Sequence, residues 1–365
     1  MCDALDVRGH RRLTRASATE SYPDPRSLPA TVEPPDLVEL RAAALAIEQE
    51  VAGAIVGQQE ALRGTLICLI AGGHALLEGV PGLGKTTMVL AYAAALGLPH
   101  SRIQFTPDLM PADITGTTVL AEHQGGAMQM RFQPGPIFTS VVLADEINRA
   151  SPRTQSALLE AMQEATVTVA GTTHPLPRPF CVLATQNPVE LRGTYPLPEA
   201  QLDRFFLKLR FGYPSRSELT DIVRRTTGAE DSATAPASSE RAQAGPDPTL
   251  LPRLGAFARE VPAAEQVLDY ASRLVLALHP GAGAAPLVDD YVRLGPSPRG
   301  AQALALAGRI AALMDGRHNL AFEDIRAVAP LALRHRLILG LDAERDAVEP
   351  DAIIAQAIER TPEPS

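Results

Sequence analysis

The sequence has 365 residues and a formal net charge of −9, so it is long enough for two domains with their own cores, and its charge argues against a general polyanion-binding surface. Apolar residues make up 45% and aromatic residues 4%, with no tryptophan, which is typical of an Ala- and Leu-rich protein with many helices. The scattered cysteines have no zinc-site or disulfide spacing, and no apolar run approaches the ~20 residues of a membrane span, so we expect a cytoplasmic protein with no membrane insertion.

The chain begins with a stretch that lacks the pattern of a folded domain. Residues 1–35 are rich in Pro, Ser and Arg, and we expect them to form a mostly disordered tail. Helical patterns follow at 37–53 and 58–72, and the second ends at a Gly-Gly pair. Short apolar runs then alternate with helical patterns, which predicts an α/β fold with a mostly parallel sheet covered on both faces. We expect the strands at 74–79, 102–106, 140–144, 181–185 and 205–211.

Two stretches break this alternation. In each, two strand-like runs flank a short Gly-containing turn, which predicts a β-hairpin. The first run, turn and second run lie at 117–120, 124–126 and 128–132 in one hairpin, and at 166–170, 171–173 and 174–179 in the other.

The second half of the chain is predicted to be a smaller helical domain. Residues 228–248 contain no Val, Ile, Leu or aromatic residue, which predicts a flexible linker. Amphipathic helical patterns follow at 250–260, 264–279, 298–314 and 323–339. We therefore divide the chain into a tail (1–35), an α/β core (36–227), a linker (228–248), a helical domain (249–342) and a C-terminal segment (343–365).

A glycine-rich loop between the first strand and its helix fits the phosphate-loop pattern at every fixed position. Its glycines let backbone N–H groups converge on a phosphate, and the following helix presents its positive end. Lys85 would supply a cation to the β- and γ-phosphates of ATP, and the Thr86 hydroxyl would ligate Mg²⁺. The alternative is a turn without a ligand. The expected nucleotide contacts are Gly79, Pro81, Gly82, Leu83, Gly84, Lys85, Thr86 and Thr87.

Two carboxylates end the apolar run at 140–144. Asp145 and Glu146 would therefore lie at the carboxyl edge of a parallel sheet, where ligands of such sheets bind. Asp145 would hold Mg²⁺, and Glu146 would polarise the water that attacks the γ-phosphate. The alternative is that both residues only begin a loop.

Three further polar residues are candidates for the same chemistry. Asn187 follows the strand at 181–185 and could orient the attacking water, although an Asn-Pro pair also begins turns. Arg204 and Arg299 could each direct a guanidinium at the γ-phosphate. A neighbouring subunit can also supply such a guanidinium. Without the family resemblance, both arginines are better explained as surface or salt-bridge residues, since most arginines are.

Taken in order, these motifs resemble the MoxR family of AAA+ ATPases. The resemblance is carried by FTPDLMPADITG at 105–116, DEINRA at 145–150 and LPEAQLDRF at 197–205, and it extends from residue 39 to residue 339. It implies a phosphate-loop core with a five-stranded parallel sheet, two inserted hairpins that line a ring pore, and a helical lid. It also implies a hexameric homo-oligomer with nucleotide sites at subunit interfaces.

The resemblance assigns roles residue by residue. Asn187 corresponds to the sensor-1 residue, Arg204 to the arginine finger that acts on the neighbour's nucleotide, and Arg299 to the sensor-2 arginine of the lid, in cis or in trans. Val56, Gly57 and Gln58 correspond to the segment that lines the adenine. Proteins of this family are associated with partners that carry a von Willebrand factor A domain and are thought to act as chaperones that mature or assemble protein complexes.

Three other functions stay open at this stage. A nucleic-acid translocase needs Lys and Arg on its pore hairpins, but 114–137 contains one arginine, Arg131, and the second hairpin region offers only His174 and Arg178. Nucleic acid is therefore an unfavoured partner. A metal-chelatase motor subunit shares the same insertions. A nucleotide-bound scaffold without turnover is disfavoured because every catalytic position is filled.

Overall fold

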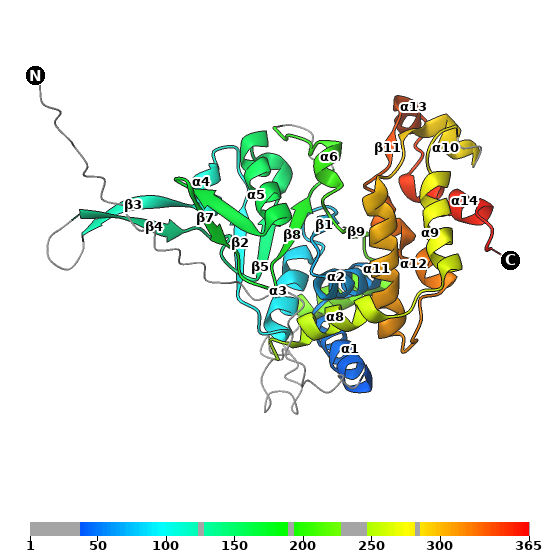
Figure 1. Cartoon of the computed structure of the whole chain (residues 1–365), viewed down its shortest axis with the longest axis horizontal. Helices are drawn as coiled ribbons and strands as arrows, with labels where there is room; N and C mark the ends of the chain where they lie inside the picture. Colours follow the sequence, from blue (N-terminus) through cyan, green and yellow to red (C-terminus); the bar gives the residue numbers. More distant parts are fainter. Residues whose placement is uncertain (1–36, 123–127, 189–192, 228–246, 282–284, 365) are drawn as a thin grey trace, which may run out of the picture. The chain divides into compact units, whose positions relative to one another are not determined.

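The computed structural model describes residues 37–122, 128–188, 193–227, 247–281 and 285–364, and Leu37–Ser365 form one compact unit (Figure 1). The predicted tail, most of the predicted linker and the turn of the first hairpin lie outside the described residues. Within the described part of the chain, no helix is both long and apolar enough to cross a membrane.

The central element is a five-stranded parallel sheet, which confirms the predicted fold class. Its strands, in spatial order, are β2 (His100–Gln104), β5 (Val141–Asp145), β8 (Cys181–Gln186), β1 (Ala75–Glu78) and β9 (Leu207–Arg210). Every residue of β5 is buried, as expected for a strand that is covered on both faces. Along it, Leu143 joins one apolar cluster, and Val142 and Ala144 join the other.

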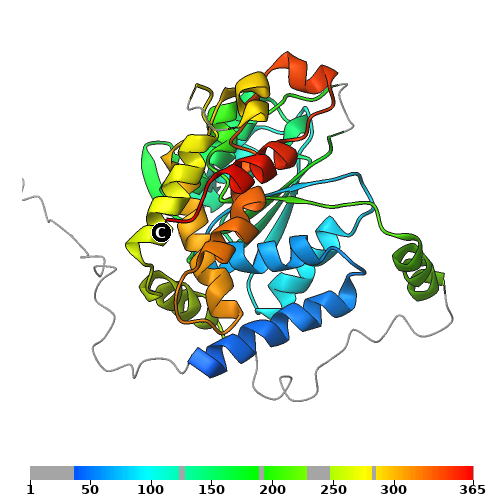
Figure 2. The same ribbon diagram turned by 90° about the vertical axis from the view of Figure 1, so that its right-hand side faces the viewer.

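Helices cover both faces of the sheet. One face packs against α1 (Leu37–Ala54), α2 (Gln59–Ala71) and α3 (Lys85–Ala95), and α1 lies beside α2 and α3 (Figure 2). The other face packs against α4 (Pro111–Thr115) and α5 (Pro152–Glu164). Local sequence sets these helix ends: Ser151 caps α5 by accepting a hydrogen bond from the Thr154 N–H, and Gly72 ends α2 in the left-handed conformation.

Both hairpins are present. The first pairs β3 (Gly116–Glu122) with β4 (Met128–Pro134), and the second pairs β6 (Thr166–Val169) with β7 (Thr172–Pro175). The turn predicted at 171–173 is wrong. Ala170 and Gly171 both have positive φ and form a two-residue turn, so Thr173 lies within β7, where its hydroxyl pairs with that of Thr168 at 3.0 Å.

The second half of the chain is mainly helical, as expected. Its helices, after α6 (Glu199–Leu202) and α7 (Arg216–Thr227), are α8 (Leu250–Glu260), α9 (Glu265–Ala277), α10 (Pro286–Tyr291), α11 (Pro298–Met314), α12 (Phe322–Leu333), α13 (Leu341–Arg345) and α14 (Pro350–Arg360). A short antiparallel ribbon of β10 (Val292–Leu294) and β11 (Ile338–Leu339) was not predicted.

The helix predicted at 323–339 is too long. α12 ends at Leu333, and the following residues Arg334, His335 and Arg336 turn toward the α/β core, where they are buried. The apolar run Leu337–Leu339 mimics a helical face in the sequence, but its last two residues belong to β11. Buried polar contacts, which no local pattern records, end the helix.

His74 joins three elements immediately before β1. Its Nδ1 accepts a hydrogen bond from the Val182 N–H at 3.0 Å, and its Nε2 therefore carries the proton and donates to the Met162 carbonyl at 3.0 Å. Burial lowers the pKa of His74 to about 4. Because both ring nitrogens are satisfied in the neutral form, protonation breaks the bond to Val182.

This arrangement predicts acid-dependent instability. The folded-state pKa of His74 is below its unfolded value, so its share of stability is complete above the unfolded pKa and is lost as the pH falls from about 6.5 to about 4, by about 3 kcal/mol in all. Urea unfolding from pH 7.5 to 4 measures this loss. His74→Asn should be less stable at pH 7.5 but should lose correspondingly less free energy of unfolding on acidification. An identical loss in both proteins would contradict the assignment.

Candidate nucleotide site

The glycine-rich loop connects β1 to α3. Gly82 and Gly84 adopt φ angles of 85° and 86°, a region that favours glycine, and the loop thereby curls around the N-terminus of α3. Lys85 folds back over this loop: its Nζ donates to the Gly79 carbonyl and, at 3.2 Å, to the Val80 carbonyl. Burial lowers the pKa of Lys85, and the nearby carboxylates of Asp145 and Glu146 act in the opposite direction.

A buried hydroxyl holds the two carboxylates in place. The Thr185 hydroxyl, on β8, donates to Asp145 Oδ1 at 2.6 Å and accepts the Glu146 N–H at 2.8 Å. Glu146 has a φ of 58°, a left-handed conformation that turns its side chain out of the strand direction. One threonine therefore fixes both the carboxylate of Asp145 and the backbone of Glu146.

The edge strand β2 supplies a second set of contacts. Arg102 Nη2 lies 2.5 Å from Asp145 Oδ2, and Gln104 Nε2 donates to Glu146 Oε2 at 2.9 Å. Arg149 Nε lies 3.0 Å from the same oxygen of Glu146.

Sequence analysis missed Arg102, Gln104 and Thr185. The sequence shows that Arg102 and Gln104 are two residues apart and so lie on the same face of a strand. Only the register of β2 with β5 places them beside the acids.

The loop and the acids face one cavity of about 400 Å³. Of the residues expected to contact the nucleotide, the metal or the water, those that line it are Pro81, Gly82, Gly84, Lys85, Thr86, Thr87, Asp145, Glu146 and Asn187. Arg102, Gln104 and Thr185 complete its wall. The structure thus brings together the loop, both carboxylates and the polar residue after β8.

Other expected residues lie elsewhere. Gly79 contributes its carbonyl to Lys85, and Leu83 packs against the apolar core. Val56, Gly57 and Gln58 form the connection between α1 and α2, where Gln58 Nε2 donates to the Gly212 carbonyl at 2.8 Å. These five residues are outside the set that lines the 400 Å³ cavity.

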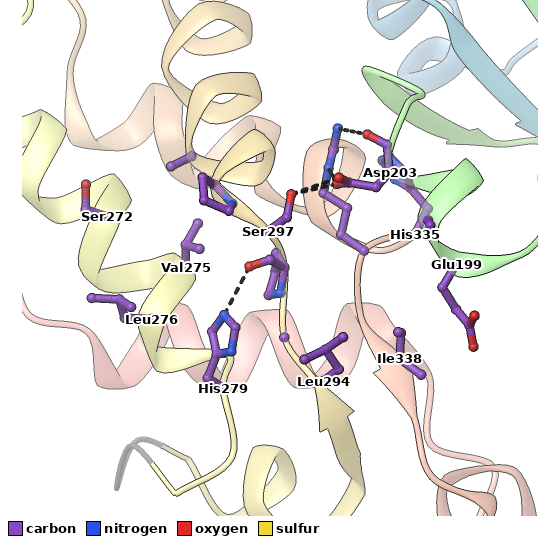
Figure 3. Close-up of a pocket in the computed structure, with 16 residues that line it drawn as sticks. Glu199, Asp203, Ser272, Val275, Leu276, His279, Leu294, Ser297, His335 and Ile338 are labelled. Carbon is purple, nitrogen blue, oxygen red and sulfur yellow. Dashed lines mark hydrogen bonds and ion pairs between the residues drawn. The ribbon is translucent and has the colours of Figure 1, made fainter. Parts of the chain in front are cut away.

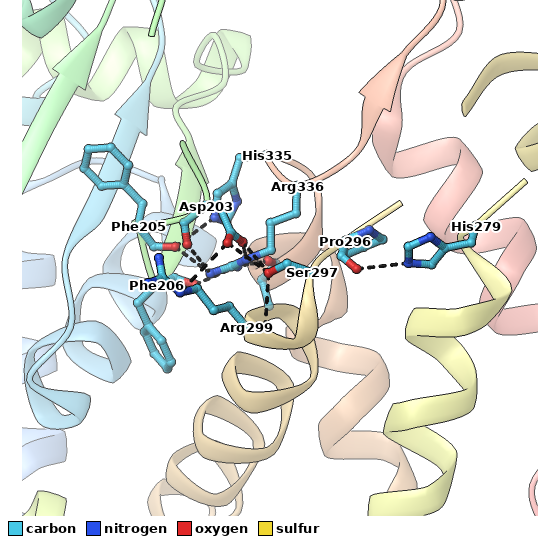
Figure 4. Close-up of polar contacts among 10 residues, drawn as sticks. Asp203, Phe205, Phe206, His279, Pro296, Ser297, Arg299, His335 and Arg336 are labelled. Carbon is cyan, nitrogen blue, oxygen red and sulfur yellow. Dashed lines mark hydrogen bonds and ion pairs between the residues drawn. The ribbon is translucent and has the colours of Figure 1, made fainter. Parts of the chain in front are cut away.

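Arg204 and Arg299 share a different cavity, of about 290 Å³, with Asp203 and Arg336. Arg204 Nη1 donates to the Leu159 carbonyl at 3.0 Å. Arg299 Nε lies 3.9 Å from Asp203 Oδ2, and Figure 4 shows both of these residues. The structure therefore brings the two arginines together, but not to the phosphate loop of their own chain.

The residues around the 400 Å³ cavity fit Mg²⁺. The Thr86 hydroxyl and the Asp145 carboxylate are oxygen donors that line the same cavity, and the Arg102 guanidinium on Asp145 shows that this carboxylate accepts a positive charge. Within the described ranges, no group of three or more His, Cys, Asp or Glu residues could hold a metal ion. Mg²⁺ takes few protein ligands and completes its shell with water and phosphate oxygens, so the two oxygen donors of Thr86 and Asp145 are sufficient for it.

Comparisons with known proteins agree with this geometry. The profile described as "ATPase family associated with various cellular activities (AAA)" matches residues 74–207, and that of the "AAA lid domain" matches residues 284–357. The Bacillus subtilis protein YeaC is 43% identical over 83% of this chain and 89% of its own length. "Chaperone MoxR1" of Mycobacterium tuberculosis is 41% identical over 85% of this chain and 79% of its own.

The chain belongs to the MoxR family of AAA+ ATPases.

A solved structure supports the same fold. The crystal structure of a candidate ATPase from Cytophaga hutchinsonii has a TM-score of 0.78 and 35% sequence identity, and covers 90% of this chain and 97% of that one. In this MoxR protein, the AAA profile includes the phosphate loop, both acids and Arg204, and the lid profile includes Arg299.

The position of Thr185 leads to a prediction. Thr185→Val keeps the volume but removes the hydroxyl that donates to Asp145 and accepts from Glu146. We expect Mg²⁺-dependent ATP turnover to fall by about 10–100-fold, as for other residues that orient metal ligands. Thr185→Ser is the matched control and should stay within a few-fold of the parent. Steady-state turnover as a function of Mg²⁺ concentration measures the effect. Equal turnover in the Val variant would show that the hydroxyl does not position the acids.

Proposed function

We propose that this MoxR protein hydrolyses ATP with Mg²⁺, and that its nucleotide site is the 400 Å³ cavity between the glycine-rich loop and the ends of β5 and β8. The observation that carries the proposal is that the loop residues Lys85 and Thr86 line one cavity together with Asp145 and Glu146. A cation for the phosphates, two metal-ligand oxygens and a carboxylate base are thus available to a single substrate.

Each side chain has a defined task in this proposal. Lys85 exchanges its contacts with the loop carbonyls for the β- and γ-phosphates, because charged oxygens are stronger acceptors than carbonyls. Thr86 and Asp145 would hold Mg²⁺, which would supply positive charge to the phosphates. Glu146 orients the attacking water and accepts its proton, and Asn187 contacts the water from β8. The Thr185 hydroxyl holds the Asp145 carboxylate and the Glu146 backbone in place.

We infer further that Arg204 and Arg299 both act on the nucleotide of a neighbouring subunit in a hexameric ring. Both line the 290 Å³ cavity, and neither is among the residues that line the cavity of the phosphate loop. In this proposal, their charges stabilise the phosphates of a nucleotide that a second subunit brings to them. Arg299, for which the sequence leaves cis and trans action open, is thus proposed to act in trans.

The work done with ATP is proposed to be the remodelling of a protein client, with a von Willebrand factor A domain protein as partner. A relative with 41% identity is named as a chaperone. On the β3–β4 hairpin, Leu120, Met128 and Met130 are more than half exposed, and Arg131 is its one basic residue among those described. Exposed Met and Leu suit contact with polypeptide, whereas nucleic-acid tracking needs positive charge.

The role of Glu146 is tested by Glu146→Gln. This variant should bind ATP with the affinity of the parent but hydrolyse it about 10²–10⁴-fold more slowly, because the amide cannot accept the proton of the attacking water. Nucleotide-binding titration and single-turnover kinetics separate the two effects. Glu160→Gln, an exposed change on α5, is the control and should be neutral. Parental turnover in Glu146→Gln would refute the proposed base.

The trans arginines are tested by mixing variants. Arg204→Ala and Arg299→Ala should each retain ATP affinity, and Arg204→Ala should lose about 10³-fold or more in turnover. Lys85→Ala should bind ATP poorly but still offer both arginines to its neighbour. Mixtures of Lys85→Ala with either arginine variant should therefore regain turnover that neither protein has alone. Absence of rescue at every mixing ratio would contradict trans action.

A further inference from the structure

Three consecutive basic residues follow α12 and enter the protein interior. Arg334, His335 and Arg336 are only 3%, 6% and 6% exposed. We call them the lid tripeptide. Their polar atoms contact Asp203–Lys208, the finger segment, which carries Arg204 and leads into β9 (Figure 4). The lid thus contacts the arginine-bearing segment through buried polar groups.

The contacts follow the backbone of the finger segment. Arg336 Nη2 donates to the Phe205 carbonyl at 2.7 Å, and its Nη1 donates to the Phe206 carbonyl at 3.3 Å. His335 Nε2 lies 3.0 Å from the same Phe205 carbonyl. Arg334 Nη1 reaches the Lys208 carbonyl at 3.2 Å. Carbonyls on both sides of the turn into β9 therefore have lid donors.

The Asp203 carboxylate accepts hydrogen bonds from two separate parts of the lid. Arg336 Nε donates to its Oδ1 at 3.0 Å, and the Ser297 hydroxyl lies 2.9 Å from its Oδ2. Ser297 also caps α11 by accepting the Arg299 N–H at 3.2 Å. Because Asp203 directly precedes Arg204, and Ser297 lies two residues before Arg299, one carboxylate connects the positions of both arginines.

Two cavities lie beside the contact between Arg336 and the finger segment. The 290 Å³ cavity of Arg204 and Arg299 includes Arg336 in its wall, and so does a mainly apolar cavity of about 820 Å³ between α6, α9 and β10 (Figure 3). His335 also lines the larger cavity, and its Nδ1 has no hydrogen-bond partner among the described residues. Directed hydrogen bonds therefore set the geometry here.

The energetics favour a role beyond stability. Burial of the Arg336 guanidinium is costly, since it lowers the pKa of Arg336, and Asp203 offsets only part of that effect. A buried ion pair adds little to stability compared with apolar side chains of the same size, but it fixes one geometry. An arginine can satisfy a carboxylate and two carbonyls at once because its donors form a rigid fork, which a lysine lacks.

We propose that Arg336, acting through Asp203, is a positioning residue that sets Arg204 and Arg299 for the nucleotide of the neighbouring subunit. This rests on the proposed ATPase ring. Its consequence is that the lid of one subunit governs hydrolysis in the next, while the nucleotide site of its own chain is unaffected.

The test uses Arg336→Lys, which keeps the buried charge, and Arg336→Ala. We expect an unchanged KM for ATP and a kcat lower by about 10-fold for Lys and about 10²-fold for Ala, the loss typical of a misplaced catalytic group. Arg326→Ala, which removes the exposed ion pair of α12 with Glu363, is the control and should keep its kcat. A parental kcat in Arg336→Lys and Arg336→Ala would overturn the proposal.

Mixing experiments separate positioning from general damage. Lys85→Ala subunits carry an intact Arg336 and should restore turnover to Arg336 variants, whereas Arg204→Ala subunits should not, because both lesions affect the same face. If Arg336→Ala fails to fold, Ser297→Ala attacks the same carboxylate from α11 and should show the same pattern with a smaller loss. If Lys85→Ala subunits rescue Arg204→Ala but not the Arg336 and Ser297 variants, the positioning role alone is overturned. If they rescue none of these variants, the proposed ring is overturned as well.

Discussion

The carboxyl ends of β1, β5 and β8 meet at one edge of the sheet, and this adjacency brings a lysine to the same cavity as two carboxylates. Parallel pairing is responsible, because it directs all strands to end on the same side. The register between β5 and β8 then brings Thr185 within hydrogen-bond distance of both Asp145 and Glu146. The rest of the proposed chemistry depends on this contact, since a loop cation without aligned acids would hold a phosphate but not cleave it.

Local patterns in the sequence predicted the parts of the site that local geometry determines. The phosphate loop is a short contiguous motif, and Asp145 and Glu146 are marked by the apolar strand before them. Thr185 and Arg102 were missed because they act through pairing between strands that are distant in the sequence. Residue type alone does not show which threonine or arginine will lie beside an acid.

The errors in the fold have the same physical origin. The helix expected at 323–339 ends early because Arg334 and Arg336 find partners in the core, and tertiary contacts of this kind override a helical apolar pattern. The second hairpin turns one residue earlier than expected because Ala170 accepts a left-handed conformation beside Gly171. Apolar runs marked β1, β5 and β8, since strands that are covered on both faces are rich in apolar residues. The edge strand β2 is mostly exposed and begins at His100, two residues before the strand expected at 102–106.

The proposed action of the two arginines would give the lid a part in catalysis. Arg204 belongs to the α/β core and Arg299 to α11, yet Asp203 and its lid partners hold them at one cavity. A movement of α11 or α12 would therefore shift both charges together. In the proposed ring, this coupling would let the nucleotide state of one subunit affect the next without a contact between the two nucleotide sites.

The most direct test of the central claim is a crystal structure with Mg²⁺ and a non-hydrolysable ATP analogue. The account predicts that Lys85 Nζ leaves the Gly79 carbonyl for the β- and γ-phosphates, and that Thr86 and Asp145 are the residues that hold Mg²⁺. A nucleotide bound away from the glycine-rich loop, or one bound there with Lys85 still on the Gly79 carbonyl, would contradict it.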